Sequence, residues 1–272
     1  MSKAEFSVKQ ARSIRDDLVT LIDESQICPR RNYHLDSISL ALFARMAELH
    51  ETICLLASKN RLRDAVILGR TLCEANISLY WLTNDRGSDE RINRYLKFGG
   101  KVTLENMIRT KKYFSYEYVP KEKWEIALLK EAEAMFRNDR YKWNNTPIGK
   151  MATESDSYEA PPTGKASSME PVYELFYYWF SLLAHPCIKA IENFLPAWGV
   201  PFKCFRPSAH QTIPEKHVVF LSTCWLFSMA LRISKFSLIR RGDKLDRIWE
   251  RLKGERGARK CTANKGRLSI SG

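Results

Sequence analysis

The segment from Leu62 to Thr83 constrains the fold more than any other part of this 272-residue chain. Its apolar residues lie on almost every side of a helix, so we expect other helices to cover it. The rest of the chain repeats apolar residues at helical spacing, and no stretch shows the sustained period-two alternation of a half-buried strand. The sequence therefore predicts an all-α fold, a multi-helix bundle with this helix at its centre.

Glycine, proline and short polar stretches mark where the helices should end. Gly99 and Gly100 stand side by side inside one helical segment, where we expect an interruption because glycine weakens a helix. The stretch from Met151 to Ser168 is polar and contains Pro161 and Pro162, which predicts a long mobile loop. The other expected helices span residues 6–22, 35–58, 88–114, 120–140, 168–195, 218–240 and 243–253.

We expect a single folded domain followed by a basic tail. Residues 1–34 form an N-terminal helix and linker, residues 35–240 the helical core, and residues 241–272 a basic, partly disordered tail. The formal net charge is +13, and the stretch 240–272 holds 11 Lys/Arg against 4 Asp/Glu, so +7 of the excess lies there. Such a tail binds phosphate backbones or keeps the protein soluble, and the sequence leaves both roles open.

Cysteine usage and hydropathy indicate a cytoplasmic protein. The seven cysteines are scattered, with no C-x-x-C pair, which favours buried thiols in a reducing compartment. The N-terminus has no secretory signal, and the longest uncharged apolar run, Val218 to Leu231, is 14 residues. Because a membrane-spanning helix needs about 20, we expect no membrane association. No metal-ligand spacing, P-loop or dinucleotide motif is present, so we expect no metal and no cofactor.

Arg70 and Glu74 are polar residues in an otherwise apolar helix. They are four residues apart and share a helix face. Ionisable groups in apolar surroundings are costly unless they are paired. The two side chains therefore form either an active-site pair, in which Arg70 holds an anion, or a buried structural ion pair.

His185 is the second candidate. It precedes Pro186, which breaks a helix and re-aims the side chains around it. Ser181 lies one turn before His185, and Tyr177 lies one turn before Ser181. His185 is therefore either a general acid or base or a packed histidine that hydrogen-bonds Ser181 or Tyr177. We expect the two polar helices to pack together, with one pocket holding Arg70, Glu74, Ser181 and His185.

A third set of residues suggests contact with nucleic acid. Basic and aromatic residues alternate along the helix that begins at Ser88, a composition that suits single-stranded RNA. A solvated face with packed aromatics is the alternative. The basic candidates for nucleic-acid binding are Arg91, Arg94, Lys97 and Lys101.

A short motif of helical ribonucleases, R-x(4–6)-H, occurs once, as Arg45 and His50. On a continuous helix the two side chains point about 140° apart, at roughly 100° per residue. A chain of this composition contains roughly one such match by chance. The motif alone therefore does not establish an active site.

The chain resembles a bacterial family known only as a domain of unknown function, number 5677, over roughly residues 35 to 200. The resemblance implies an all-helical bacterial protein. Its layout is similar to that of HEPN-type helical proteins, many of which are ribonucleases in toxin and antiphage systems. The R-x(4–6)-H pair, however, lies on a different helix from His185. The resemblance rests on the 65–75 segment around Leu68-Gly69-Arg70-x3-Glu74-Ala75, on Arg91, Arg94 and Tyr95, on Trp143, Ile148 and Met151, and on Tyr177-x3-Ser181-x3-His185-Pro186.

Two functions remain open at this stage. The first is a cytoplasmic bacterial defence or accessory protein that binds or acts on RNA. In its enzymatic form it is a metal-independent HEPN-like ribonuclease, with His185 as acid or base and Arg70 or Arg94 on the phosphate. The second is a non-catalytic helical module that binds a protein partner or forms a homodimer.

Overall fold

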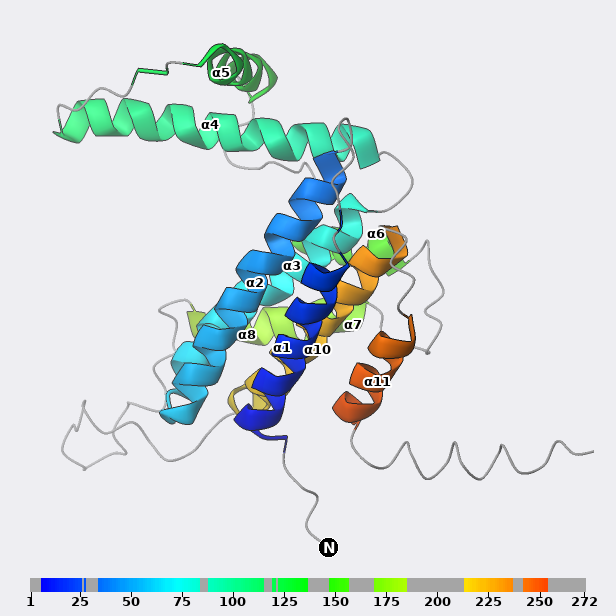
Figure 1. Cartoon of the computed structure of the whole chain (residues 1–272). Coiled ribbons are helices and arrows are strands. Elements are labelled where there is room, and N and C mark those ends of the chain that lie inside the picture. The colour runs from blue at the N-terminus through cyan, green and yellow to red at the C-terminus, as the bar shows by residue number, and fades with distance from the viewer. Residues whose placement is uncertain are drawn as a thin grey trace, which may run out of the picture.

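The computed structural model describes residues 6–25, 27, 34–83, 88–114, 119–120, 122–136, 147–156, 169–184, 213–236 and 242–253. All regular secondary structure within these residues is helical, which confirms the all-α prediction. Figure 1 shows a bundle of long helices, with one further pair crossing over its end.

Helix α3 (Leu62–Leu82) is the centre of the bundle, as the sequence predicts. It packs between α2 (His34–Ser58) and α10 (Ile213–Phe236), and these three helices supply most of the core. Arg232 of α10 is buried and closes the end of α3, because its guanidinium donates to Thr83 Oγ1 at 2.7 Å and to the Thr83 carbonyl at 3.0 Å. The side chains of α3 with no exposed surface are Ala65, Val66, Leu72, Cys73, Asn76, Ile77, Leu79 and Leu82.

The helix near the N-terminus, α1 (Val8–Glu24), belongs to the same core. Ser7 begins it with a capping box, in which Ser7 Oγ and the Gln10 side chain each accept a backbone N–H of the other residue. Its four buried residues fall at helical spacing and pack on α2 and α10. Helix α11 (Gly242–Lys253) lies against α1 in turn. The described helices on either side of residues 34 and 240 therefore contact one another, and the expected domain bounds stay a prediction.

Helix α10 contains an 18-residue window, His217–Ser234, that is apolar and long enough to cross a membrane. Within the described residues it is the one window that meets this criterion, and 67% of it is buried inside the bundle. Its contacts with α3, α2 and α1 make it a core helix of the bundle.

Helices α4 (Ser88–Phe114) and α5 (Lys123–Phe136) form the pair that crosses the end of the bundle in Figure 1. The expected interruption at Gly99 and Gly100 is wrong, because α4 is continuous. Gly100 lies where α5 approaches most closely: a Cβ there would be 3.1 Å from Ala132 Cβ and 3.2 Å from Leu128 Cγ. The contact with α5 offsets the weak helix propensity of the two glycines.

The prediction of a loop from Met151 to Ser168 is also wrong for its first residues, 151–156. Residues Ile148–Asp156 form α6, which packs on α3. Met151, Ala152 and Ser155 are buried at helical spacing, so tertiary contact stabilises a helix that the polar composition does not favour. The next described segment contains α7 (Met169–Val172), a π-helix η2 (Tyr173–Tyr177) and α8 (Tyr178–Ala184).

Candidate functional site

The π-helix η2 lies directly beside the residues that the sequence singles out. π-Helical turns are rare and are often found at functional sites. Here η2 contacts α3 and α6. Gly149 of α6 makes room for the ring of Tyr173, because a Cβ at this position would be 2.8 Å from Tyr173 Cε1. The ring of Tyr173, in the wider turn of the π-helix, therefore packs directly on the backbone of α6 at Gly149.

Arg70 meets the other end of the π-helix. Its Nη2 donates to the hydroxyl of Tyr177 at 3.3 Å, and its Cζ is 5.3 Å from the centre of that ring. The rings of Tyr173 and Tyr177 stack at 5.2 Å with an interplanar angle of 21°. All three side chains are half-buried. The result, which we call the Arg70 site, is a cation over the ring of Tyr177, which stacks with Tyr173.

The hydroxyl group of Tyr173 is neutral at physiological pH. Burial raises the pKa of Tyr173 above its ordinary value of 10.0, and Tyr177 and Glu174 add to the increase. A neutral phenol both donates and accepts hydrogen bonds.

Tight packing between α3 and α8 lies next to the Arg70 site. A Cβ on Gly69 would be 2.8 Å from Phe180 Cε2 and 3.1 Å from Val218 Cγ2. Phe180 has no exposed surface, and its ring meets Trp225 edge to face at 5.7 Å. Helices α3 and α8 thus approach each other through a residue without a side chain, which confirms that the two polar helices pack together.

A buried amide lies further along α3. Asn76 has no exposed surface, and its Nδ2 donates to Met169 Sδ at 3.5 Å. Within the described residues its Oδ1 has no hydrogen-bond donor. Leaving a buried acceptor unsatisfied costs about 1–3 kcal/mol. No sequence pattern distinguishes Asn76, whereas the four-residue spacing of Tyr173 and Tyr177 is a signal that could have identified Tyr173.

Glu74 does not join Arg70 in the interior. It is exposed, together with Ile67 and Thr71, so these three residues mark a stripe of α3 that faces solvent. The predicted pair inside the bundle is therefore wrong for Glu74. Ser181 is half-buried on α8, one turn after Tyr177. His185 lies outside the described residues.

Arg91, near the N-terminal end of α4, binds to the end of α3. Its Nη1 donates to the carbonyl of Trp81 at 2.8 Å, and its guanidinium lies 4.1 Å from the centre of the Trp81 ring. Glu154 of α6 accepts from Trp81 Nε1 at 2.8 Å and is 3.8 Å from Arg91 Nη2. These contacts join α3, α4 and α6.

The other three basic candidates of α4 contact α5 or their own helix. Arg94 lies over the ring of Phe136 at 4.8 Å, and Lys97 forms an ion pair with Glu131 at 3.0 Å. Lys101 is only 7% exposed and lies 5.6 Å from the centre of the Phe136 ring. All three have partners within the protein, and RNA binding by the four basic residues stays a prediction.

The pair Arg45 and His50 does not form a site. Arg45 lies on the surface with an ion pair to Glu48, whereas His50 has no exposed surface. His50 Nε2 is 2.8 Å from Thr223 Oγ1, and its Nδ1 is 3.7 Å from Cys54 Sγ. Because both side chains of the Cys–His contact are deeply buried, the pKa of His50 falls to about 4 and that of Cys54 rises to about 12. Both groups are therefore neutral at pH 7.

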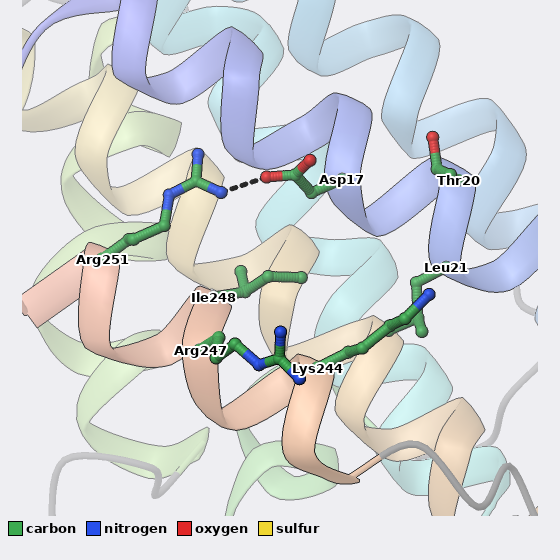
Figure 2. Close-up of a pocket in the computed structure, with 7 residues that line it drawn as sticks. All are labelled: Asp17, Thr20, Leu21, Lys244, Arg247, Ile248 and Arg251. Atoms are coloured by element: carbon green, nitrogen blue, oxygen red, sulfur yellow. Dashed lines mark hydrogen bonds and ion pairs between the residues drawn. The ribbon is translucent and has the colours of Figure 1, made fainter.

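A pocket of about 250 Å³ lies between α1 and α11. Figure 2 shows Arg251 of α11 bound to Asp17 of α1 across this pocket. Lys244 binds Glu24 at 2.9 Å, and Arg247 binds Asp243 of its own helix at 3.0 Å. Carboxylates thus match the cations of α11, and the pocket presents little net charge to an anion.

The thiols and acids of the described residues are not arranged for a metal ion. Cys54 and Cys73 are buried free thiols, as the scattered cysteines predict. Burial also raises the pKa of Cys73. Within the described segments, no group of three or more His, Cys, Asp or Glu side chains could hold a metal.

Comparison with known proteins gives one match. A family model, described as a family of unknown function, matches residues 36–198. The match covers more than half of the 272 residues and agrees with the range over which the sequence shows a resemblance. No curated protein and no solved structure matches the chain.

Proposed function

The chain belongs to DUF5677, a family of unknown function, and we propose that it binds single-stranded RNA at the Arg70 site. The observation that carries the proposal is the guanidinium of Arg70, which donates to the Tyr177 hydroxyl and lies over a ring that stacks with Tyr173. A guanidinium binds phosphate oxygens through paired hydrogen bonds. Aromatic faces stack bases without regard to sequence.

Two further aromatic side chains are exposed on the turn that follows the Arg70 site. Tyr178 and Trp179 follow the π-helix and are 56% and 42% exposed. Stacking on an aromatic side chain is worth about 1–3 kcal/mol per base. A strand of a few nucleotides would thus find one cation and several aromatic faces along η2 and α8, a composition that suits single-stranded RNA better than a duplex.

The finer proposal is cleavage of the bound strand as a metal-independent, HEPN-like ribonuclease. His185, hydrogen-bonded to Ser181, takes the proton of the ribose 2′-hydroxyl, whose oxygen attacks the adjacent phosphorus. The bond from phosphorus to the 5′-oxygen of the next nucleotide breaks, and that oxygen receives a proton from His185, which leaves a 2′,3′-cyclic phosphate. Arg70 stabilises the charge that develops on the phosphate. Glu74, exposed one turn after Arg70, is available to orient the guanidinium when RNA is bound. In this proposal the protein acts in the bacterial cytoplasm, in defence against phage.

Binding is tested by fluorescence anisotropy with a labelled single-stranded oligoribonucleotide. We expect Arg70→Ala and Tyr173→Ala each to weaken binding roughly tenfold, the effect of removing one charged hydrogen bond or one stacked base. Arg45→Ala is the matched control, because Arg45 is an exposed arginine with a surface ion pair on α2. Circular dichroism and a thermal melt check that each variant folds. Full affinity in a folded Arg70→Ala protein would overturn the proposed site.

Cleavage is tested separately on a gel, in the presence of a chelator. We expect the wild type to degrade the oligoribonucleotide and His185→Gln to bind it without degrading it, since Gln cannot titrate near neutral pH. If the wild-type protein binds the oligoribonucleotide and does not cleave it, the ribonuclease proposal is wrong and the binding proposal still stands.

A further inference from the structure

Helices α4 and α5 form an arm that exposes large apolar side chains at its tip. Phe114 is 79% exposed, and Tyr113 and Ile108 are each 67% exposed, all within the last two turns of α4. Trp124 in the first turn of α5 is 67% exposed, and Val119 between the helices is 63% exposed. Figure 1 shows that the C-terminal end of α4 projects away from the bundle and that α5 lies over the middle of α4. We call these five residues the arm tip.

The arm buries little apolar surface of its own. Helix α5 has 14 residues and buries only Leu129, Ala132 and Phe136. These three side chains do not belong to the main core, and α5 packs chiefly on α4. Helices shorter than about 12–15 residues are marginal in water without tertiary contacts. An additional packing partner would therefore stabilise the arm.

The exposed area at the arm tip is large for a surface that stays in water. An aromatic side chain has about 150–250 Å² of surface, so the three aromatics leave on the order of 400 Å² exposed. Ile108 and Val119 raise the total that the five side chains expose along the arm to roughly 600 Å², against about 300–600 Å² for the largest apolar patch of a typical monomer. One side of a standard protein interface is about 800 Å². The arm tip supplies most of that area.

The two helices of the arm carry charges of opposite sign. The distal half of α4, residues 101–114, has four basic residues and Glu105, for a net charge of +3. Helix α5 has Glu125, Glu131 and Glu133 against two lysines, for a net charge of −1. A two-fold axis pairs the same surface of both copies. It can therefore place α4 of each copy against α5 of the other.

We propose that the arm pairs with the arm of a second copy of this chain, so that two α4–α5 hairpins form a four-helix bundle. Two hairpins packed in this way bury the apolar faces of all four helices. A second copy offers carboxylates of its α5 to the basic residues of α4 and basic residues of its α4 to α5, whereas RNA or an anionic membrane matches only α4, so the charges favour a second copy as the occupant. This pairing does not depend on RNA binding at the Arg70 site.

Light scattering after size-exclusion chromatography of the full chain tests the pairing. We expect a dimer for the wild type, and we expect Trp124→Glu and Phe114→Glu each to raise the dissociation constant at least about tenfold, as truncation of a central aromatic does. Leu55→Glu is the matched control, because Leu55 is 49% exposed on α2, away from the arm. Circular dichroism checks that each variant keeps its helices.

A charge-reversal pair tests the geometry. Arg109→Glu with Lys112→Glu changes the net charge of the distal half of α4 to −1, and Glu125→Lys with Glu133→Lys changes that of α5 to +3. Each double variant alone should be mostly monomeric, and an equimolar mixture of the two should form a heterodimer. A wild type that is monomeric at every concentration would overturn the proposal. So would a dimer that the arm-tip variants leave unchanged, or a monomer whose arm tip binds vesicles or RNA.

Discussion

His50 shows how burial decides the role of a reactive side chain. Thr223 Oγ1 donates to the Val219 carbonyl at 2.7 Å, so it accepts from His50 Nε2–H at 2.8 Å. This tautomer leaves Nδ1 as the acceptor for the Cys54 thiol. The chain of neutral hydrogen bonds links α2 to α10. A Cys–His contact that would suggest a nucleophile in an exposed cleft is here part of the core.

The first prediction concerns the pH dependence of stability. The pKa of His50 falls from 6.5 to about 4 on folding, chiefly because burial disfavours the charged ring. Between these values the unfolded chain binds a proton that the folded chain does not. Stability is therefore full above pH 6.5 and is lost as the pH falls towards 4, by about 1 kcal/mol at pH 5.5 and about 3 kcal/mol in all.

Urea unfolding at pH 7.5, 6.5 and 5.5 measures this loss. The comparison variant is His50→Gln, which removes the titrating ring and should flatten the slope over this range. A wild type with the same free energy of unfolding at pH 7.5 and pH 5.5 would show that His50 takes up its proton in the folded state.

At the scale of single elements, replacing two glycines with alanine should change the free energy of unfolding in opposite directions. Gly69→Ala should lower the free energy of unfolding by about 1–3 kcal/mol, since the new methyl group meets the fully buried Phe180. Gly99→Ala should raise it by about 0.5–1 kcal/mol, because no atom lies within 4 Å and alanine favours the helix. Thermal melts of both variants check the pair. Equal effects of the two changes would contradict the close packing of α3 on α8.

Elements also show where sequence patterns fail. Helix α6 forms because Met151 and Ala152 pack on α3, although the segment reads as polar. Helix α4 continues through Gly100 because α5 packs there. The π-helix at Tyr173–Tyr177 adds a residue to one turn, and a pattern based on 3.6 residues per turn does not anticipate it. In each case a distant part of the chain decides the local conformation.

For the whole molecule, net charge is distributed unevenly between helix α11 and the residues that follow it in the sequence. Helix α11 has four basic and three acidic residues, a net charge of +1, and its cations bind carboxylates of α1 and of α11 itself. Residues 255–272 have five basic residues and one acidic residue, a net charge of +4. Most of the excess charge of the C-terminal segment therefore lies beyond the described helix.

The last prediction follows from this distribution. Deleting residues 255–272 should weaken RNA binding and flatten its dependence on salt, by about 0.7 in the logarithmic slope for each phosphate that the segment neutralises. Anisotropy titrations at several salt concentrations measure the slope. Deletion leaves α11 and its contacts with α1 in place, so folding serves as the internal control. Equal binding at every salt concentration would mean that the segment only keeps the protein soluble.

The sequence alone determined the helical class, the central place of α3, the burial of Cys54 and Cys73, and the packing of the helix with Arg70 against the helix with Tyr177. These features follow from the spacing of apolar residues, which is a local property of the chain. Only the tertiary structure decided which partner Arg70 takes, that Glu74 faces solvent, and that Arg91, Arg94, Lys97 and Lys101 have partners within the protein. The identity of a polar partner depends on the register of helices that are far apart in sequence, and no local pattern records that register.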